Sequence, residues 1–385
     1  MKRLKVLFIT AWYPTKEQPV GNVFVREHAK AVRLYDDVVV LHCAGSDAKI
    51  KGLWRMEQES DESLTEGIPT YRVWHKPLPI PKISYLLYLW SAFKAFRRTT
   101  AQDVRWDIIH AHVFQAGLPA VLIGWSHRIP VVVTEHWSHF PKKLLDPSSV
   151  WKASFAFHWA RLVMPVSRSL QQAIEAYGIK ARFHVVPNVV DTQLFYPNSF
   201  PQSKSQSLKR LLFVGLFDPS HKKGVPHLLQ ALAQLRHVRD DWHLDIVGDG
   251  PTRGEYERLV VDSGLGERVT FHGLRSKREV AEFMRKANLF VVASPSETFA
   301  AVAAEALATG TPVLSTRCGG PEEFIIDDVG MLVPPGDTEA LCSGLDYMLD
   351  HLGSFPPDRV SRYAHERFSP EQVGKLLHDT YTTLG

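Results

Sequence analysis

Short apolar runs alternate along the whole chain with longer segments whose apolar residues recur at helical spacing. In the first half, six runs have the length of buried strands: Leu4–Ile9, Val38–His42, Ile108–His112, Val131–Glu135, Leu162–Val166 and His184–Val186. Helical patterns lie between them, such as Val23–Leu34, Ser84–Arg98 and Ser169–Tyr177. Strands that are almost continuously apolar are typical of parallel sheets covered on both faces.

The second half starts the same alternation again. Its strand-like runs are Arg210–Val214, His243–Val247, Val269–His272, Leu289–Ala293 and Val313–Ser315. Its helical patterns are Val225–Leu235, Glu255–Ser263, Lys277–Lys286 and Ala301–Thr309. The pattern predicts an α/β fold of two Rossmann-like, doubly wound parallel-sheet domains, which face each other across a ligand-binding cleft.

A run rich in Ser, Pro and Gln, without periodicity, separates the two halves. We therefore predict an N-terminal domain at 1–195, a linker at 196–209 and a C-terminal domain at 210–368. Residues 369–385 are predicted to form a terminal helix, because Val373, Leu376, Leu377 and Tyr381 recur at helical spacing. The N-terminal domain is one candidate surface for that helix.

Composition favours a globular protein in a reducing compartment. The chain has 385 residues, of which 45% are hydrophobic and 22% are charged. Three widely spaced cysteines do not make a disulfide framework. The apolar run near the N-terminus is too short for a secretion signal, and no run of about 18 apolar residues suggests a membrane span. We expect a cytoplasmic location.

The net charge of +4 conceals a difference between the two halves. Residues 1–200 hold 25 Lys and Arg against 16 Asp and Glu, whereas residues 201–385 hold 20 against 25. A basic first half and an acidic second half suggest different partners.

Two glutamates stand eight positions apart where a loop is predicted to enter a helix. Glu297 follows a Ser-Pro-Ser loop, and Glu305 lies inside the helix predicted from Ala301. The free backbone N–H groups of the first helical turn lie between them and form a ready site for phosphate. This arrangement suits a nucleotide-sugar, although a solvated loop glutamate and a helix glutamate would give the same spacing.

Two glycine-containing loops follow strands of the second half. In the first, Gly215 opens a loop that ends with Lys222, Lys223 and Gly224, and either ammonium could meet a phosphate there. In the second, Gly248 begins a Gly-Asp-Gly-Pro turn. A surface turn with two lysines and an ordinary tight connection are the plainer interpretations.

Histidines gather near strand ends of the first half. His136 comes just after a strand, where an imidazole can hydrogen-bond sugar hydroxyls or stabilise developing charge, or be purely structural. His110 and His112 share a face of one strand. With His136 and His139 they could suggest a metal, but no carboxylate or cysteine joins them at a ligand spacing. No Asp-x-Asp pair occurs either, so we predict no metal and no resident cofactor.

The segment 76–105 is rich in aromatic and basic residues. It carries six Lys and Arg against one acid, Asp103. A helix of this kind could lie on an anionic membrane surface, or it could simply cover the sheet. The modest overall charge and the lack of a recognition motif argue against a nucleic-acid partner.

These features together resemble the large family of retaining nucleotide-sugar glycosyltransferases with two Rossmann-like domains, known as the GT-B fold, of the group 1 and family 4 type. The resemblance covers nearly the whole chain. Its markers are Trp12-Tyr13-Pro14, Glu135-His136, Val186-Pro187-Asn188, Gly215 to Gly224, Gly248-Asp249-Gly250-Pro251, Phe271-His272-Gly273, the Glu297 and Glu305 pair, Gly310-Thr311-Pro312 and Gly319-Gly320-Pro321-Glu322-Glu323.

The resemblance implies a role for several residues around the donor. Glu297 would contact the donor sugar where the glycosidic bond breaks, and His136 would touch the same sugar from the first domain. Lys223 would neutralise the diphosphate, helped by the backbone amides of Ala300, Ala301 and Val302. A metal would not be needed.

The remaining implied contacts concern the nucleoside and the acceptor. Glu305 would accept hydrogen bonds from the ribose hydroxyls. Gly215 and Gly248 would line the nucleotide site, and the loops after Gly248 and His272 would select the base. Gly21 would line the acceptor side of the cleft.

Three positions depart from the family pattern. Leu216 stands where an arginine usually shares the diphosphate charge, Ala300 stands where a glycine is usual, and the glycine pair of the first loop is reduced to Gly21. A charge-assisted contact contributes roughly 1.5–3 kcal/mol, so the missing arginine matters most. His221 or Lys222 could replace it.

The resulting hypothesis is a metal-independent retaining transferase that moves a sugar from a nucleoside-diphosphate donor to a hydroxyl of a glycan or a lipid-linked acceptor. The basic first half adds peripheral contact with an anionic membrane. A non-catalytic sugar-nucleotide binder or scaffold is the alternative that Leu216 and Ala300 favour. A two-lobed extracytoplasmic binding protein is a third class, which would need a secretion signal.

Overall fold

The computed structural model describes residues 3–19, 21–100, 105–198 and 208–384. The chain divides into two compact units. Unit 1 comprises residues 1–189 and 370–385, and unit 2 comprises residues 190–369. The sequence had suggested a boundary after residue 195 and a linker at 196–209, most of which lies outside the described residues.

Unit 1 is built on a seven-stranded sheet with the order β3-β4-β2-β1-β5-β6-β7. The strands are β1 (Lys5–Thr10), β2 (Asp37–Ser46), β3 (Trp54–Gln58), β4 (Thr70–His75), β5 (Ile108–His112), β6 (Val131–Glu135) and β7 (Leu162–Pro165). All neighbouring strands are parallel except β3 and β4, which are antiparallel. The order reverses between β1 and β5, and such a switch point is where doubly wound sheets bind ligands.

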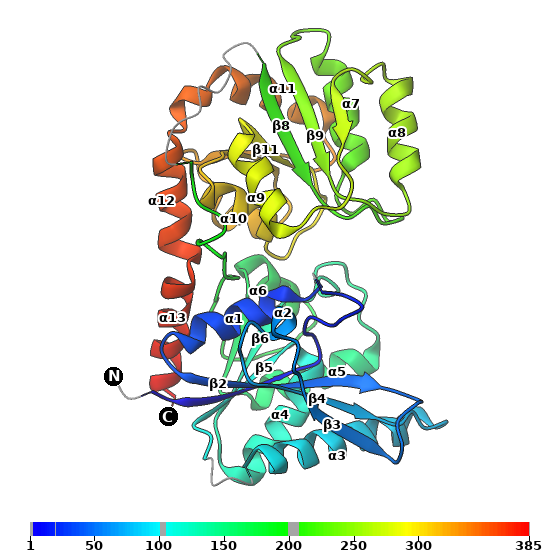
Figure 1. Ribbon diagram of the computed structural model, residues 1–385, viewed down its shortest axis with the longest axis vertical. Helices are drawn as coiled ribbons and strands as arrows, with labels where there is room; N and C mark the ends of the chain where they lie inside the picture. The colour runs from blue at the N-terminus through cyan, green and yellow to red at the C-terminus, as the bar shows by residue number, and fades with distance from the viewer. Residues whose placement is uncertain (1–2, 20, 101–104, 199–207, 385) are drawn as a thin grey trace. The chain divides into compact units, whose positions relative to one another are not determined.

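Helices cover both faces of this sheet (Figure 1). They are α1 (Val23–Arg33), α2 (Glu62–Thr65), α3 (Pro81–Thr100), α4 (Phe114–His127), α5 (Pro147–Trp159), α6 (Arg168–Glu175) and the terminal α13 (Pro370–Thr382). Helices α3 and α4 lie on the face opposite to α1, and α5 packs against α4.

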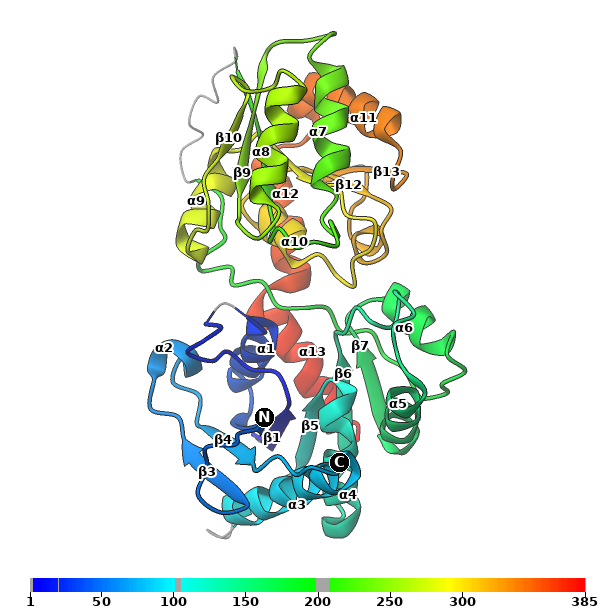
Figure 2. The ribbon, with the colours of Figure 1, turned by 90° about the vertical axis from the view of Figure 1, so that its right-hand side faces the viewer.

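The terminal helix α13 belongs to unit 1 and packs beside α1 (Figure 2). Val373, Leu377 and Tyr381 are buried in one core with Val25 and Val32 of α1. Val373, Leu377 and Tyr381 are among the residues whose spacing predicted this helix, so the apolar stripe read from the sequence is the face that packs.

Unit 2 is built on a six-stranded parallel sheet with the order β10-β9-β8-β11-β12-β13. Its strands are β8 (Lys209–Val214), β9 (Trp242–Val247), β10 (Val269–Phe271), β11 (Leu289–Val292), β12 (Val313–Thr316) and β13 (Gly330–Val333). The order reverses between β8 and β11, which places a second switch point there.

The helices of unit 2 are α7 (Val225–Leu235), α8 (Arg253–Asp262), α9 (Lys277–Lys286), α10 (Ala301–Ala308), α11 (Thr338–Asp350) and α12 (Pro357–Phe368). Two short 3-10 helices, Gly320–Glu323 and Leu352–Ser354, complete the unit. Figure 2 shows α7 and α8 side by side along one face of the sheet. The prediction of two Rossmann-like parallel-sheet domains is confirmed.

One predicted strand is wrong. The segment His184–Val186 makes two backbone hydrogen bonds to β7 and only an isolated bridge, between Phe183 and Val163, so it extends along the sheet edge without forming a strand. Strand β7 has only four residues and ends at Pro165, which accepts the bond from Val186, so no strand remains for pairing beyond this point.

Three strands were missed: β3 at the edge of the first sheet, its neighbour β4, and β13 at the edge of the second sheet. In β3 and β4, charged residues such as Arg55, Glu57 and Arg72 interrupt the apolar residues, so neither segment contains an apolar run of strand length. Strand β13 has only four residues. The antiparallel edge that β3 and β4 form is also the exception to the predicted parallel sheet.

Candidate active site

The switch point of unit 2 brings together two loops that the sequence had singled out separately. The loop after β8 runs from Gly215 to Gly224, and the loop after β11 runs from Ala293 to Ala300. Because β8 and β11 are parallel neighbours, their carboxyl ends open at the same edge of the sheet.

Lys223 and Glu297 form an ion pair across these loops. The Lys223 Nζ donates to Glu297 Oε1 over 2.6 Å, and the Ser294 hydroxyl donates to the same oxygen over 2.7 Å. Both charged side chains are mostly buried, with 26% and 15% exposure. The backbone of Glu297 is also fixed, because its N–H donates to Cys318 O and its carbonyl accepts from Gly320 N.

Close backbone approach at this edge requires glycine at two positions. A Cβ on Gly224, which has φ +71°, would lie 1.8 Å from the carbonyl oxygen of Ala293. A Cβ on Gly248 would lie 1.8 Å from the carbonyl oxygen of Gly215. The glycines therefore let three loops meet, and they hold Lys223 next to Gly215 and the carboxylate of Glu297.

Helix α10 begins directly after this ion pair. Its N-cap is Ala300, which adopts left-handed φ 65° and ψ 64° and makes no side-chain capping bond. This conformation costs a non-glycine residue roughly 1–2 kcal/mol, whereas glycine, which the resemblance led us to expect here, adopts it readily. Glu305 lies in the second turn of α10, as the spacing predicted.

The loop that carries Leu216 lacks a replacement arginine in the family position. Leu216 is 59% exposed. The Lys222 ammonium is 3.1 Å from Asp218, and His221 Nδ1 is 2.9 Å from the hydroxyl of Tyr256. Lys222 and His221, the two possible replacements for the arginine, thus each have a partner on a neighbouring side chain.

His272 is held by a carboxylate in the sheet. Its Nε2 is 2.7 Å from Asp245 Oδ1, and its ring packs on Phe283 with centroids 4.5 Å apart. Arg210 bonds the other oxygen of Asp245. This pairing orients the imidazole and fixes the start of the loop that follows β10.

His136 lies at the switch point of unit 1, in a buried group of histidines. Its Nε2 is 3.2 Å from His112 Nδ1, and its ring stacks on that of His112 and contacts the tilted ring of Phe24 with centroids 4.3 Å apart. His28 of α1 packs against both His112 and His136 with centroids 5.5 Å away. Burial lowers the pKa of His112 and His136 well below the usual value, so both rings are neutral at pH 7.

His110 stacks on His112 with ring centroids 4.3 Å apart, whereas His139 lies outside this contact group. His110 bonds the Tyr381 hydroxyl through Nδ1 and the Thr134 hydroxyl through Nε2, which uses both of its ring nitrogens. His139 stacks on Trp137 with centroids 4.0 Å apart. Of the four histidines that the sequence grouped, His110 is structural and His139 belongs to a separate stack.

Glu135 organises the loop that presents His136. Its carboxylate is fully buried and accepts three backbone N–H bonds, from Phe114, His136 and Trp137. Burial raises its pKa to about 7, and the three N–H donors oppose that rise. The carboxylate therefore ties the end of β6 to the first turn of α4.

Three of the buried histidines have the geometry of a candidate cation site among the residues that the structure describes. His28, His112 and His136 each offer a ring nitrogen, and these atoms lie within 4.8 Å of one another. The donor set contains no carboxylate, and His112 and His136 already hydrogen-bond each other. The absence of a metal from the reaction remains a prediction.

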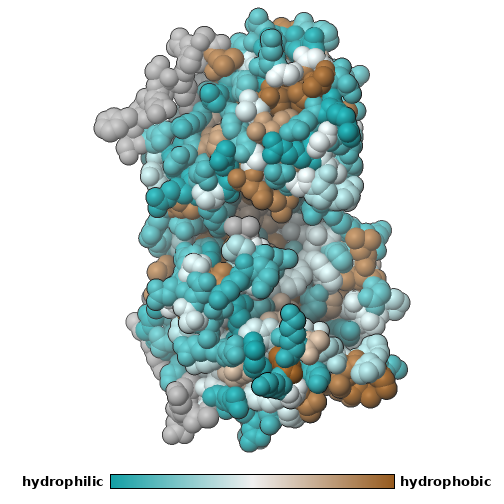
Figure 3. Space-filling model, turned by 45° about the vertical axis from the view of Figure 1, so that its right-hand side comes forward, coloured by the Kyte–Doolittle hydropathy of each residue, from teal (hydrophilic) through white to brown (hydrophobic). Residues whose placement is uncertain are grey.

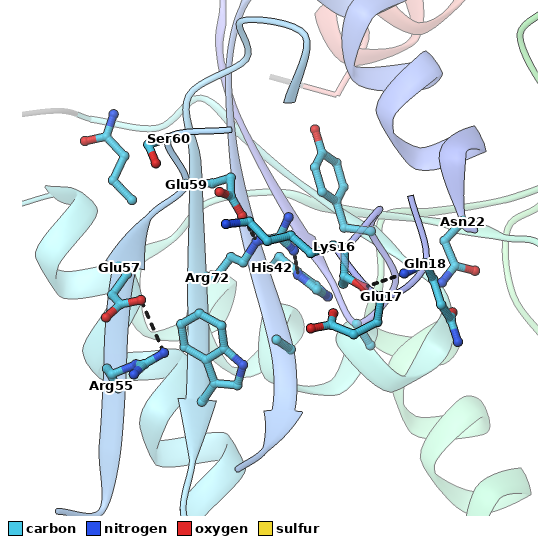
Figure 4. Close-up of a pocket in the computed structure, with 16 residues that line it drawn as sticks. Lys16, Glu17, Gln18, Asn22, His42, Arg55, Glu57, Glu59, Ser60 and Arg72 are labelled. Atoms are coloured by element: carbon cyan, nitrogen blue, oxygen red, sulfur yellow. Dashed lines mark hydrogen bonds and ion pairs between the residues drawn. The ribbon is translucent and has the colours of Figure 1, made fainter. Parts of the chain in front are cut away.

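A polar pocket opens beside this switch point, over strands β3 and β4 (Figure 4). Its volume is about 540 Å³. Three cations, Lys16, Arg55 and Arg72, and three carboxylates line it, together with Trp74 and the loop after β1. The carboxylates are Glu17, Glu57 and Glu59.

Arg72 is the fixed point of this pocket. It is buried on β4 and bonds Glu59, His42 Nδ1 and the carbonyl of Pro14. Its guanidinium therefore joins the segment after β3, the strand β2 and the loop after β1. Gly21 lies at the far end of that loop, where its N–H donates to Gln18 O. Gln18 and Asn22 on either side of Gly21 line the pocket.

The sequence reasoning missed three groups at these sites. Ser294 was treated only as a loop residue, His28 lay unnoticed within the buried stripe of α1, and Arg72 lay in an unpredicted strand. A histidine between the buried Val25 and Val32 of an amphipathic helix was a usable signal for His28. Arg72 had no such signal, because its partners are distant in sequence.

Two Rossmann-like α/β units are the architecture of the GT-B fold, and comparisons with known proteins identify the class as glycosyltransferases. Residues 21–194 match the family model described as Glycosyltransferase Family 4, and residues 208–351 match Glycosyl transferases group 1. The chain belongs to this glycosyltransferase family.

Several relatives are similar over most of their length. An uncharacterized glycosyltransferase of Methanocaldococcus jannaschii is 30% identical over 84% of this chain and 82% of its own. The MMP alpha-(1->4)-mannosyltransferase of Mycolicibacterium hassiacum is 33% identical over 86% and 93%. The putative teichuronic acid biosynthesis glycosyltransferase TuaC of Bacillus subtilis is 26% identical over 98% and 93%.

Solved structures share the fold. Anabaena HepE in complex with UDP superposes with a TM-score of 0.77 at 22% identity, covering 99% of this chain and 100% of that one. The sucrose-phosphate synthase of Thermosynechococcus elongatus gives a TM-score of 0.75 at 22% identity, covering 99% of both chains.

Proposed function

We propose that this glycosyltransferase moves a sugar from a nucleoside-diphosphate donor to a hydroxyl of a glycan or lipid-linked acceptor, with retention of configuration and without a metal. The observation that carries the proposal is the buried Lys223–Glu297 pair at the switch point of unit 2, directly before the N-terminus of α10. A cation and a helix N-terminus together can stabilise the diphosphate that leaves.

In this scheme the donor is held by unit 2. Lys223 and the amides of Ala300, Ala301 and Val302 face the diphosphate, and Glu305 meets the ribose hydroxyls. Glu297 contacts the sugar, and its position is already set by Ser294 and by its backbone bonds. A site that is fixed before binding loses little freedom when the donor arrives.

His136 serves the sugar from unit 1 as a neutral imidazole. Because its pKa is lowered by burial, it would act as a hydrogen-bonding group and not as a fixed positive charge. The acceptor occupies the pocket of Figure 4, whose volume falls within the roughly 300–1,000 Å³ common for small-molecule sites. Cations and carboxylates in equal number suit a neutral ring with many hydroxyls.

The names of relatives support these assignments. The HepE structure contains UDP, which makes UDP a first candidate for the donor nucleotide. A mannosyltransferase and a protein of teichuronic acid biosynthesis support a sugar donor and a glycan acceptor. A cytoplasmic location at the inner membrane face is part of the same proposal.

A non-catalytic binder is the second candidate. The exposed Leu216 in place of the family arginine and the left-handed Ala300 favour it. The intact Lys223–Glu297 pair favours catalysis, since a carboxylate held beside the diphosphate cation has no evident use in a scaffold.

Calorimetry without metal tests the donor site. We expect one of UDP, GDP and ADP to bind the wild-type protein, and Glu305→Ala and Lys223→Ala each to weaken that binding by about one to two decades. Lys222→Ala is the matched charge variant one position away. If it weakens binding as much as Lys223→Ala, Lys222 replaces the missing arginine; if affinity is unchanged, it does not.

Turnover with the matching nucleotide-sugars decides between the two candidate functions. Transfer that is lost in Glu297→Gln while nucleotide binding persists would support catalysis. Absence of binding by all three nucleotides would favour the scaffold.

A further inference from the structure

Three neighbouring helices of unit 1 carry no acidic residue. Helices α3, α4 and α5 together contain the five cations Lys82, Lys94, Arg97, Arg98 and Lys152, but no Asp or Glu. They pack on one another, α4 against both α3 and α5, so their outer sides form one continuous layer. Such an imbalance is unusual for a solvated helical layer, where both signs are normally interspersed.

Helix α3 has two apolar stripes. The sequence had left open whether this helix covers the sheet or lies on a membrane surface. One stripe, including Leu87, Ala92 and Phe96, is buried beneath the helix. The other consists of Ile83, Leu86 and Trp90, which are 46%, 63% and 40% exposed. The helix therefore covers the sheet and also presents a hydrophobic surface outward. Residues 101–104, which include Asp103, lie outside the described residues.

A cluster of exposed tryptophans continues this surface on α4 and α5. Trp125, Trp151 and Trp159 are 47%, 60% and 49% exposed. Trp125 and Trp159 touch with centroids 4.6 Å apart, and Phe155 lies between Trp151 and Trp159 on one side of α5. Figure 3 shows patches of aliphatic and other hydrophobic residues at the lower right of the view, on unit 1, whereas tryptophan itself is drawn pale on this hydropathy scale.

The cations of the layer lie against its aromatic rings. Lys94 lies over Trp90 at 4.8 Å, and Lys152 of α5 lies over Tyr85 of α3 at 4.5 Å. Long side chains that run along aromatic rings and keep their charged ends in water are typical of the border between hydrocarbon and headgroups.

A groove at the edge of the layer adds two more cations. It has a volume of about 760 Å³ and is lined by Trp125, Trp159, Arg128 and Arg161, among others, without any carboxylate side chain. Neither guanidinium is paired with a carboxylate among the described residues. Planar guanidinium groups beside tryptophans suit the phosphate of a lipid headgroup.

We propose that the outer surface of α3, α4 and α5, together with this groove, docks on an anionic membrane. The layer is here called the docking layer. No helix of the described chain is long and apolar enough to cross a membrane, so this contact is an interfacial one in which aromatic side chains enter the headgroup region and cations meet lipid phosphates. The inference extends the proposed function by naming the partner surface, but it requires no transfer activity.

Cosedimentation with large unilamellar vesicles at low salt tests the proposal. The full chain is expected to bind vesicles of phosphatidylcholine and phosphatidylglycerol at a 7:3 ratio, and to bind pure phosphatidylcholine weakly. Replacing both Arg128 and Arg161 with Gln should weaken binding about 30-fold, which corresponds to about 2 kcal/mol. Replacing both Trp151 and Trp159 with Ala should weaken it at least tenfold.

Matched controls come from exposed residues of unit 2. Arg278→Gln removes an exposed cation, and Tyr347→Ala removes an aromatic ring with 52% exposure. Both should leave vesicle binding unchanged. The urea unfolding midpoint of each variant reports whether unit 1 is intact. Nucleotide affinity, which belongs to unit 2, keeps a failure of docking distinct from a failure of the proposed function.

Three results would overturn the proposal. The first is no binding to anionic vesicles at low salt. The second is binding that the docking-layer variants reduce no more than the unit 2 controls do. The third is a concentration-dependent dimer that the tryptophan variants convert to a monomer, because the layer would then meet a second copy of the chain.

Discussion

At the scale of single residues, the proposed donor site depends on two glycines, which have no side chain and so let the loops approach closely. The Lys223 ammonium reaches Glu297 because Gly224 lets one loop touch the carbonyl of Ala293. Gly248 plays the same part against Gly215. The departures at Leu216 and Ala300 leave this arrangement in place, since neither changes the close approach of the loops.

Substitution of Gly224 tests this dependence. Gly224→Ala puts a methyl group 1.8 Å from a carbonyl oxygen at positive φ, so the loop must move. We expect a loss of about 2–4 kcal/mol in the free energy of unfolding and a loss of nucleotide binding. Urea unfolding and calorimetry measure the two effects.

Gly254→Ala is the matched control. A Cβ at Gly254 meets no atom within 4 Å, and the residue lies in helix α8, so this variant should be equal to or more stable than wild type. Equal behaviour of the two variants would contradict the close-approach argument.

At the scale of elements, distant segments complete the core of unit 1. Helix α13 comes from the end of the chain, yet His378 bonds Asp36 and Tyr381 bonds His110 of β5. The Cβ of any residue at Gly374 would lie 2.2 Å from the carbonyl oxygen of Ala31, so α1 and α13 are nearly in backbone contact. The terminal helix thus contacts the histidines of β5 through the Tyr381 hydroxyl, which hydrogen-bonds His110.

The hydroxyl of Tyr381 is the most direct test of that contact. Tyr381→Phe leaves the buried Nδ1 of His110 without its partner at 2.6 Å. We expect a loss of about 1–3 kcal/mol in the free energy of unfolding, measured by urea titration. Tyr347→Phe removes a hydroxyl from a half-exposed residue and should change stability by less than about 0.5 kcal/mol. Similar effects of the two substitutions would argue against a contribution from this contact.

At the scale of the whole molecule, we expect the two units to respond differently to acid. Six buried histidines of unit 1 have pKa values lowered by burial: His28 to about 4, His42 to about 3, His110, His112 and His136 well below the usual value, and His75 below it. Unfolding exposes these rings, which then bind protons below pH 6.5.

The stability of unit 1 should therefore fall as the pH drops from about 6.5 toward 4. In that range the unfolded state binds more protons than the folded state, so each histidine costs up to about 1.4 kcal/mol per pH unit. Glu135, whose pKa is raised to about 7, acts in the opposite direction but is a single group. Nine of the ten tryptophans lie in unit 1, so tryptophan fluorescence in urea reports this transition.

Stability between pH 7.5 and 9 provides the reference for this experiment, because the histidines are neutral there in both states. A fluorescence midpoint that stays constant from pH 7.5 to 5 would contradict the assignment of buried neutral histidines.

The sequence by itself determined the class of fold and most of its elements. Continuous apolar runs predicted both parallel sheets, and the helical spacing near Val373 predicted α13, because burial on both faces or on one stripe leaves a periodic record in the chain. It also placed Glu297 before α10 and Glu305 within it, since helix boundaries depend on local residues. The role of each in transfer remains a prediction.

Only the tertiary structure decided which residues meet. The pairing of Lys223 with Glu297, the packing of His28 against His136 and the pocket around Arg72 join segments that are tens of residues apart, and no local pattern records such contacts. The strands β3 and β4 were not predicted because charged residues interrupt their apolar residues. The docking layer exists only because the fold brings three helices onto one surface. Periodicity records how much of an element is buried, whereas the chemistry of a surface depends on which elements the fold brings together.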